Sequence, residues 1–298
     1  EDMIRMRTGG TEGVILKKNS NDRTLLEMPT TLGNTYLGLD AGKANVAGIN
    51  NTVAGDSSLV SNTESSNTAI GSKALKSTTT GANNTAVGFN TLTASTLATQ
   101  NTAVGHACMQ VNTAGQMVAI GFNALNKNTT GDYNTAIGVN TLHENTTGTQ
   151  NTAAGTEALH DNTVGDFNTA IGHFALHANT TGERNTAFGF HALEDNITGT
   201  NNTGFGSQAL AANITGDFNT ASGMNAMKAF ISGDYNTAIG FEALTTAVSG
   251  DHNTAMGYQA LKANIGGIKN TAVGYQAMLL ATGHDNTAIG YLALKDLT

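Results

Sequence analysis

Eight histidines are the side chains of this sequence best suited to metal binding or acid–base chemistry. They are His106, His143, His160, His173, His177, His191, His252 and His284. His173 and His177 have the four-residue spacing that brings two imidazoles to one ion, but only on a helix. Too few residues lie between the surrounding glycines to form one. We therefore predict no metal site at this pair and place the histidines at the surface. The less favoured alternative is an ion on the axis of a trimer, bound by one histidine from each copy.

The glutamates are scattered rather than paired. Cleavage of a polysaccharide needs two carboxylates that face one groove. No such pair stands out among the glutamates at the variable positions, which are Glu144, Glu157, Glu183, Glu194 and Glu242. We therefore predict no catalytic residues and no enzyme. A polysaccharide-degrading spike is the least favoured class.

A Gly-Asp pair, in most cases followed by an aromatic residue, recurs at Asp132, Asp166, Asp217, Asp234 and Asp251. Oxygen ligands at turns suit calcium. However, a calcium-binding roll needs denser acidic ligands than these and a Gly-Gly-x-Gly-x-Asp pattern. Capping of turns by the aspartates is the favoured interpretation, and a calcium site is the weaker one. No other cofactor is predicted.

Aromatic residues recur at a similar spacing. They are Phe122, Tyr133, Phe167, Phe190, Phe218, Tyr235, Phe241, Tyr258 and Tyr275. A stacked ladder that stabilises the fold is favoured over a platform for carbohydrate. The single cysteine, Cys108, stands where related segments carry a small residue, and we expect a packed rather than a reactive thiol.

These residues all belong to one repeat. Sixteen segments align on Asn-Thr, and twelve of the fifteen steps between them are 17 residues long while three are 16. The consensus is N-T-A-[IV]-G-[YF]-x-A-L-x-x-N-T-T-G-D-[YF]. The fifth position is Gly in all sixteen segments, the ninth is Leu or Met in fifteen, and the third is Ala in thirteen. Such regularity predicts a solenoid.

The start of each repeat, N-T-A-I-G, predicts a short strand closed by glycine. Alternation places Thr and Ile on one face and Asn, Ala and Gly on the other. We expect the Thr and Ile side chains to point inward, and the small-residue face to let a partner chain approach. The A-L segment is expected to be a second short strand or a bend, and N-T-T-G-D the turn into the next coil.

A single repeat cannot fold alone. Ordering 17 residues costs roughly 25 kcal/mol. Burial of one Leu and one Ile returns only about 3–6 kcal/mol. Stacked coils must therefore supply the remaining stabilisation, and an interior this poor in large side chains is narrow or completed by partner chains. Sixteen coils at about 4.8 Å spacing form a rod on the order of 75 Å long.

Composition excludes several partners. The formal charge of −8 is spread thinly, whereas nucleic acids and anionic membranes need clustered Lys and Arg. No run of 18 apolar residues is present, so no membrane insertion is expected. The single cysteine rules out a disulfide framework within the chain.

Segments such as Asn134-Thr135-Ala136-Ile137-Gly138 and Asn286-Thr287-Ala288-Ile289-Gly290 resemble the S-V-A-I-G repeats of trimeric autotransporter adhesin heads. The longer N-T-T-G-D-Y-N-T-A-I-G units are similar to those of phage tail-fibre proteins, which often precede an endosialidase-type intramolecular chaperone domain. The resemblance covers about residues 33–298. It implies a left-handed parallel β-roll, a homotrimer, attachment to a surface glycan or protein receptor, and an extracellular, cell-surface or virion location.

Residues 1–32 do not follow the repeat. Three short strands are predicted, at residues 3–7, 14–18 and 24–28, with Gly9 and Gly10 forming a turn between the first two. An atypical end unit is what a solenoid needs to protect its open edge, so we interpret this region as a cap or connector.

The sequence therefore predicts an all-β chain with an N-terminal β cap or connector at residues 1–32 and a sixteen-coil β-solenoid at residues 33–298. Its predicted function is that of a non-catalytic structural and attachment fibre. The alternative is an ice-binding solenoid that uses files of Thr; it ranks lower because the Thr file of the strands is expected to point inward.

Overall fold

A computed structural model describes residues 4–8, 11–18, 24–27, 33–45, 47–280 and 282–296. The first three ranges are the strands β1 (Ile4–Thr8), β2 (Thr11–Lys18) and β3 (Thr24–Glu27). They form a three-stranded antiparallel sheet in the order β1-β2-β3. The three predicted N-terminal strands are confirmed, and their capping role stays a prediction.

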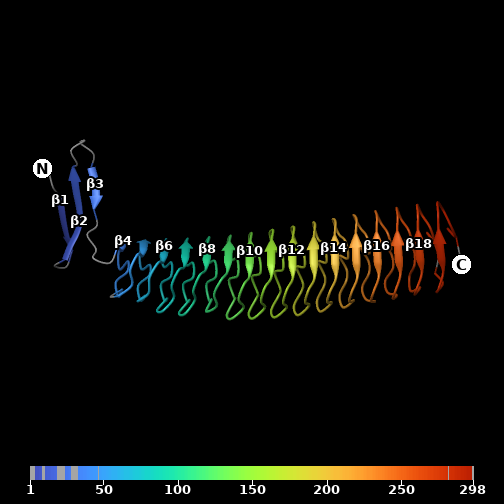
Figure 1. The fold of residues 1–298 in the computed structure, drawn as a ribbon, viewed down its shortest axis with the longest axis horizontal. Helices are drawn as coiled ribbons and strands as arrows, with labels where there is room; N and C mark the ends of the chain where they lie inside the picture. The colour runs from blue at the N-terminus through green and yellow to red at the C-terminus, as the bar shows by residue number, and fades with distance from the viewer. Residues whose placement is uncertain are drawn as a thin grey trace.

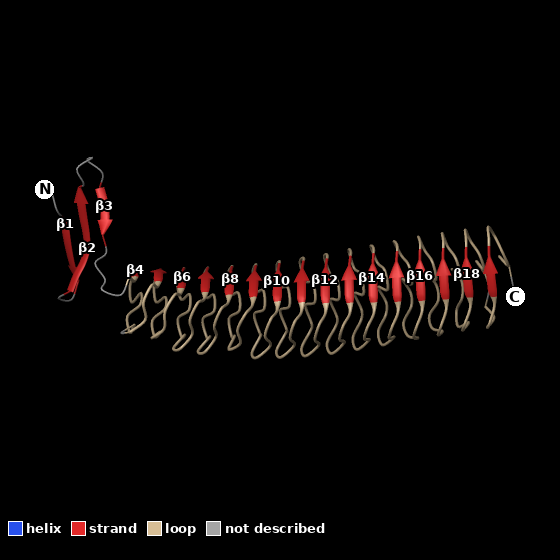
Figure 2. Cartoon of the chain, in the orientation of Figure 1, coloured by secondary structure: helices blue, strands red, loops and turns tan. Residues whose placement is uncertain are grey.

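The repeats form a parallel β-solenoid. Sixteen strands lie side by side in one sheet, in sequence order from β4 to β19 (Figure 1). Each strand pairs with the next in register, so that Thr135, Ala136 and Ile137 face Thr152, Ala153 and Ala154. The remainder of each coil is loop and turn, and the described residues contain no helix (Figure 2). The predicted all-β solenoid is thereby confirmed.

Every solenoid strand has three residues, and these are the second to fourth positions of the repeat. The strands are β4 (Thr35–Leu37), β5 (Thr52–Ala54), β6 (Thr68–Ile70), β7 (Thr85–Val87), β8 (Thr102–Val104), β9 (Val118–Ile120), β10 (Thr135–Ile137), β11 (Thr152–Ala154), β12 (Thr169–Ile171), β13 (Thr186–Phe188), β14 (Thr203–Phe205), β15 (Thr220–Ser222), β16 (Thr237–Ile239), β17 (Thr254–Met256), β18 (Thr271–Val273) and β19 (Thr287–Ile289).

The fifth-position glycine ends each strand because of its backbone conformation. Gly138 has φ +139°, a value that side chains disfavour. A Cβ on Gly138 would also lie 2.5 Å from the carbonyl oxygen of Gly155 in the next coil. Both constraints recur along the stack, which explains why this position is always glycine.

The interior of the coil is lined by the strand face that carries the small side chains, and not by the face that carries Thr and Ile. Ala136 and Leu142 are fully buried, whereas Ile137 is exposed and Thr135 is only half-buried. The predicted orientation of the strand faces is therefore wrong, and so is the expectation that the small-residue face meets a partner chain. The reason is space: the ninth-position Leu fills the narrow coil and leaves room opposite it for a small side chain, which is Ala in thirteen coils, Gly204 in one and the fully buried Val53 in another. A Cβ on Gly204, at the third position, would lie 3.1 Å from the Ala209 carbonyl oxygen and 3.4 Å from the Leu193 side chain.

The A-L segment is a bend with an unusual backbone. Residues at the seventh and ninth positions have a left-handed conformation, with φ 52° at Asn140 and 50° at Leu142. β-Branched side chains tolerate this conformation poorly. Only Leu and Met, and Gly42 in the first coil, occur at the ninth position.

Two ladders of buried asparagine run through the coils. At the first position, the backbone N–H of Asn151 donates to Oδ1 of Asn134 (2.9 Å), and its own Nδ2 donates to the Gly165 carbonyl (2.8 Å). At the twelfth position, side-chain amides bond directly from coil to coil, as between Nδ2 of Asn162 and Oδ1 of Asn145 (2.7 Å). The second ladder is continuous over Asn112, Asn128, Asn145, Asn162, Asn179, Asn196 and Asn213.

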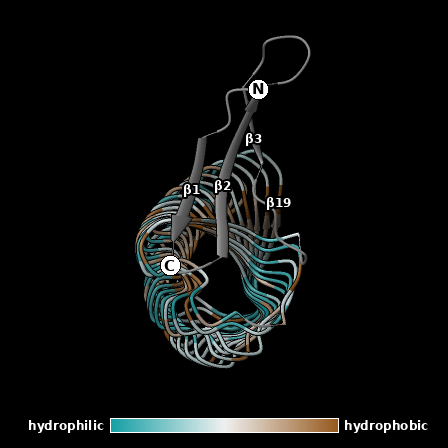
Figure 3. Cartoon of the chain, turned by 90° about the vertical axis from the view of Figure 1, so that its left-hand side faces the viewer, coloured by the Kyte–Doolittle hydropathy of each residue, from teal (hydrophilic) through white to brown (hydrophobic). Residues whose placement is uncertain are grey.

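The first coil departs from the repeat in a compensated way. Tyr36 takes the place of the inward Ala, and Gly42 takes the place of Leu. A Cβ on Gly42 would collide with the Tyr36 ring, which therefore occupies the space of the missing Leu. Nδ2 of Asn45 donates to the Tyr36 hydroxyl (2.7 Å). Viewed along the stack, the coils superimpose as rings of similar outline (Figure 3).

Candidate functional site

The outer face of the sheet is a regular array. Fifteen of the sixteen strands begin with Thr, and Val118 is the exception. In-register pairing aligns these residues in one file along the rod, at a spacing of about 4.8 Å. The fourth-position side chain projects from the same face, about 6.7 Å along the strand. Contrary to the predicted inward orientation, this Thr file is accessible from outside the coil.

Beside it runs a surface that we call the apolar stripe, formed by the fourth and sixth positions of the repeat. Both positions point outward on either side of the strand-ending glycine. Its exposed large side chains are Leu37, Leu39, Ile70, Phe89, Ile120, Phe122, Ile137, Val139, Phe188, Phe190, Phe205, Met224, Ile239, Met256, Tyr258, Tyr275, Ile289 and Tyr291. A surface of this kind on a soluble protein generally marks an interaction site.

Aromatic side chains stack in ladders on this surface, as predicted. The rings of Phe241, Tyr258, Tyr275 and Tyr291 follow one another with centroids 5.1–5.4 Å apart and nearly parallel planes. A second ladder at the turns joins Phe218, Tyr235 and His252. Ring faces within such a ladder cover one another and leave mainly edges for a ligand, which weakens the alternative of a carbohydrate platform.

The turn aspartates cap backbone groups of the preceding coil. Oδ1 of Asp166 accepts from the N–H of Thr149 (2.6 Å), and Oδ1 of Asp234 accepts from the N–H of Asp217 (2.8 Å). This agrees with the capping interpretation, although the bond reaches across coils rather than within one turn. Within the described ranges, these aspartates belong to no group with metal-ligand spacing.

Each glutamate singled out from the sequence is paired with a neighbouring lysine, arginine or histidine side chain. Glu144 pairs with Lys127 (2.7 Å), and Glu242 pairs with Lys262 (2.6 Å). The hydrogen bond from Lys127 lowers the pKa of Glu144, and that from Lys262 lowers the pKa of Glu242. Glu183 pairs with Arg184, Glu157 with His177, and Glu194 with His191.

The histidines lie at or near the surface, as expected, but three of them form a stack that the sequence analysis did not predict. His177 does not share a ligand group with His173, whose ring stacks on Phe190 at 5.6 Å. Instead His143, His160 and His177 stack coil upon coil, with centroids 5.2 Å apart. The signal missed in the sequence is the 17-residue interval between them, because spacing of one repeat places side chains next to each other in a solenoid.

Cys108 is buried, as expected for its small position. Its Sγ–H donates to the carbonyl oxygen of Ala119 (3.3 Å). Burial raises the pKa of the thiol to about 12. The thiolate is therefore scarce at neutral pH, and Cys108 has no nucleophilic character in the folded chain.

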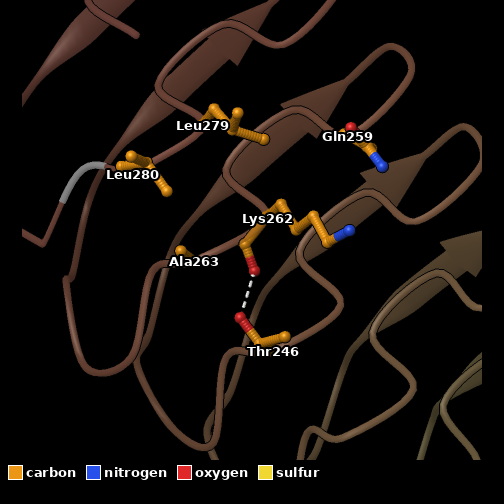
Figure 4. A pocket seen from close by; sticks show the side chains of 6 residues that line it. All are labelled: Thr246, Gln259, Lys262, Ala263, Leu279 and Leu280. Atoms are coloured by element: carbon orange, nitrogen blue, oxygen red, sulfur yellow. Dashed lines mark hydrogen bonds between the residues drawn. The ribbon is translucent and has the colours of Figure 1, made fainter. Parts of the chain in front are cut away.

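A surface pocket of about 270 Å³ lies near the C-terminal end of the solenoid. It is lined by Thr246, Gln259, Lys262, Ala263, Leu279 and Leu280 (Figure 4). The Thr246 hydroxyl donates to the Lys262 carbonyl (2.6 Å), and the Lys262 ammonium is already paired with Glu242. This lining has neither a nucleophile with an adjacent base nor two facing carboxylates, so it gives no support for catalysis.

No helix in the described part of the chain has the length and apolarity to cross a bilayer. Comparison with known proteins adds no identity: no family model matches this chain, and no curated protein or solved structure is similar to it.

Proposed function

We propose that this chain is a non-catalytic structural and attachment fibre, a rigid rod that assembles as a homotrimer through the apolar stripe. The observation that carries the proposal is the stripe itself, which runs along one flank of the stack and exposes a large apolar side chain in most coils. In an oligomer with closed symmetry every copy makes equivalent contacts, so the stripe of each chain would be buried in the same way. A rod built this way spaces or presents a receptor-binding surface, in keeping with the resemblance to adhesin heads and tail fibres and with an extracellular location.

The dimensions of the stripe set the size of the contact between copies. Sixteen coils at about 4.8 Å spacing give a length of roughly 75 Å. With a width of about 10 Å, the stripe offers roughly 750 Å² per chain, which a trimer divides between two neighbours, so each contact stays below the about 800 Å² per partner of a standard interface. Charged side chains would interrupt such a contact, and among the fourth and sixth positions of the described coils only Asp56 carries an exposed carboxylate and none carries Lys or Arg.

The test is the mass of the protein in solution by analytical ultracentrifugation, with its frictional ratio. We expect an elongated particle of three 30.5 kDa chains. The double variant Ile120→Lys/Ile137→Lys places two charges on the stripe and should give monomers. The matched control, Thr130→Lys/Thr147→Lys, changes exposed positions on the turn side of the same coils and should stay trimeric. An elongated monomer for the unaltered chain would overturn the proposal.

A second candidate function is ice binding, and the outward Thr file favours it. Repeated Thr hydroxyls and methyl groups on a flat, rigid sheet can order water in a regular lattice. The same face cannot bind ice and be covered by a partner chain. Measurable thermal hysteresis that is lost in Thr135→Tyr/Thr152→Tyr, in a protein that sediments as a monomer, would establish ice binding. Absence of hysteresis would exclude it.

A further inference from the structure

The tenth position of the repeat carries a histidine in three successive coils. His143, His160 and His177 lie on one flank, and their rings are within 11° of parallel. All three are partly exposed, with 18–26% of the side-chain surface accessible. An ion can therefore reach them from solvent, and the rings have room to rotate.

Carboxylates surround this file. Asp161 lies beside His160, with 2.6 Å between Oδ1 and Nδ1. Glu157 approaches His177, with 3.3 Å between Oε2 and Nε2. In the next coil, Asp195 is desolvated and adjacent to Glu194, and both effects raise the pKa of its carboxyl group. The flank is thus rich in groups that a cation would stabilise.

We propose that His160, Asp161 and His177 form a binding site for one first-row divalent transition metal ion, such as Zn²⁺. The three potential ligand atoms lie within 4.8 Å of one another, and this is the one such group in the described part of the chain. A point equidistant from three atoms at that separation is about 2.8 Å from each. Zinc bonds to nitrogen and carboxylate oxygen are about 2.0–2.2 Å long. Each ligand atom therefore has to move toward the ion by less than about 1 Å.

Ring orientation is the adjustment that binding requires. The lone pair of an imidazole nitrogen lies in the ring plane, and two parallel stacked rings cannot both direct theirs at one point between them. Rotation of the His177 ring about its side-chain bonds, away from the stack, brings its nitrogen toward the ion. These three ligands leave the fourth tetrahedral position for water, and Glu157, which lies 3.3 Å from Nε2 of His177 but outside the group of three, is a nearby carboxylate.

The ligand types select the class of ion. Two imidazoles with one or two carboxylates suit zinc, copper, nickel or ferrous iron, whereas calcium and magnesium prefer oxygen ligands alone. The other histidines of the described ranges form no such set. At His106, for example, the ring is stacked between Phe89 and Phe122, and the residue belongs to no potential ligand group within the described ranges.

The experiment is titration of the purified full chain with Zn²⁺ by isothermal calorimetry, and with Co²⁺ by visible absorption as a direct report of coordination. We expect one ion per chain and a tetrahedral Co²⁺ spectrum. His160→Ala, Asp161→Asn and His177→Ala should each weaken binding at least tenfold, while His106→Ala should leave it unchanged. Circular dichroism of each variant checks that the solenoid is intact.

Two outcomes would overturn the site. One is absence of saturable Zn²⁺ binding to the unaltered chain at micromolar concentrations. The other is equal affinity in the double variant His160→Ala/His177→Ala with the fold preserved, because binding would then reside elsewhere. Neither outcome affects the proposed rod function, which is tested by mass rather than by metal.

Discussion

At the scale of single residues, buried asparagines hold the coils together through their side-chain amides. Asn162 donates to Oδ1 of Asn145 and to the Gly165 carbonyl, and its own Oδ1 accepts from Asn179 (2.8 Å). Where Phe230 replaces the next ladder residue, Oδ1 of Asn213 has no hydrogen-bond partner. An amide donates through its NH₂ group and accepts through its C=O group at once, so each Asn can bond to the coils on both sides and to a backbone carbonyl, which an uninterrupted ladder requires.

We expect Asn162→Ala to destabilise the solenoid by about 2–5 kcal/mol, because it deprives two buried amides of a partner. Asn162→Asp preserves the shape but opposes two oxygens at the bond to Asn145, and should be at least as damaging at neutral pH. Urea denaturation followed by circular dichroism measures both effects. Thr147→Ala, at an exposed position two residues beyond the ladder in the preceding coil, is the control and should change stability by less than about 0.5 kcal/mol. Equal stability of all three variants would contradict the ladder's role.

The ninth position combines burial with a left-handed backbone. Leu142 is fully buried at φ 50°. A γ-branched or unbranched side chain fits there, whereas branching at Cβ crowds the adjacent backbone.

Leu142→Ile should therefore cost about 1–3 kcal/mol more than the volume change alone explains. Leu142→Met, which keeps an unbranched Cβ and occurs naturally at Met109, Met227 and Met278, should cost less than about 1.5 kcal/mol. Thermal unfolding of the two variants side by side makes the comparison. If Ile is tolerated as well as Met, backbone conformation does not explain the residue choice.

At the scale of the strand, the glycine after each strand sets the distance between coils. From Gly38 to Gly274, a Cβ built on each of these glycines would lie 2.1–2.8 Å from the carbonyl oxygen of the corresponding glycine in the next coil. Coil-to-coil hydrogen bonds continue directly beside it, as from the N–H of Gly138 to the Ile120 carbonyl (2.8 Å). A side chain here would force the coils apart and break the sheet at that point.

Gly138→Ala is predicted to cost about 3 kcal/mol or more, from φ strain together with the collision against Gly155. Gly266→Ala is a matched control, since a Cβ there meets nothing within 4 Å and its φ lies outside the disfavoured range. The control should be neutral or stabilising by up to about 1 kcal/mol. Denaturant midpoints and limited proteolysis, read at the altered coil, distinguish the two. A Gly138→Ala protein that unfolds at the same denaturant midpoint as the unaltered chain would refute this account.

At the scale of the molecule, the rod is a stack of interchangeable units, each in contact with its neighbours. Stability in such proteins is the sum of terms for each coil and each interface between coils. The chain can therefore be shortened by whole repeats without loss of any file of side chains. A deletion of any other length puts every later residue at a different position of the coil from its counterpart in the preceding coil.

Deletion of residues 185–201, which is one 17-residue repeat, should give a folded rod about 4.8 Å shorter. It brings Asn213 onto Asn179 in the buried ladder. Deletion of residues 185–193 removes nine residues and should abolish cooperative folding of the adjacent coils. Small-angle X-ray scattering reports the length, and circular dichroism reports the melting. Similar behaviour of the two deletions would show that register between coils does not govern the fold.

The sequence alone determined the repeat, its sixteen strands and the three short strands before it. These follow from local chemistry: a β-branched start, a closing glycine and turn residues at a fixed interval. The stacking of aromatic rings and the capping by turn aspartates were predictable for the same reason, because residues one repeat apart must become neighbours. Applied to His143, His160 and His177, that rule would also have identified the histidine file.

Only the tertiary structure decided which face of each strand lies inside. Alternation separates Thr135 and Ile137 from Ala136 but does not say which side is buried. The left-handed bend at Asn140 and Leu142 decides it, because it turns the Leu into the narrow coil, where a small side chain such as Ala fits opposite. The Thr file and the apolar stripe are accessible as a consequence, and both proposed functions depend on them. Strand periodicity is a local property, whereas burial depends on how the whole coil closes.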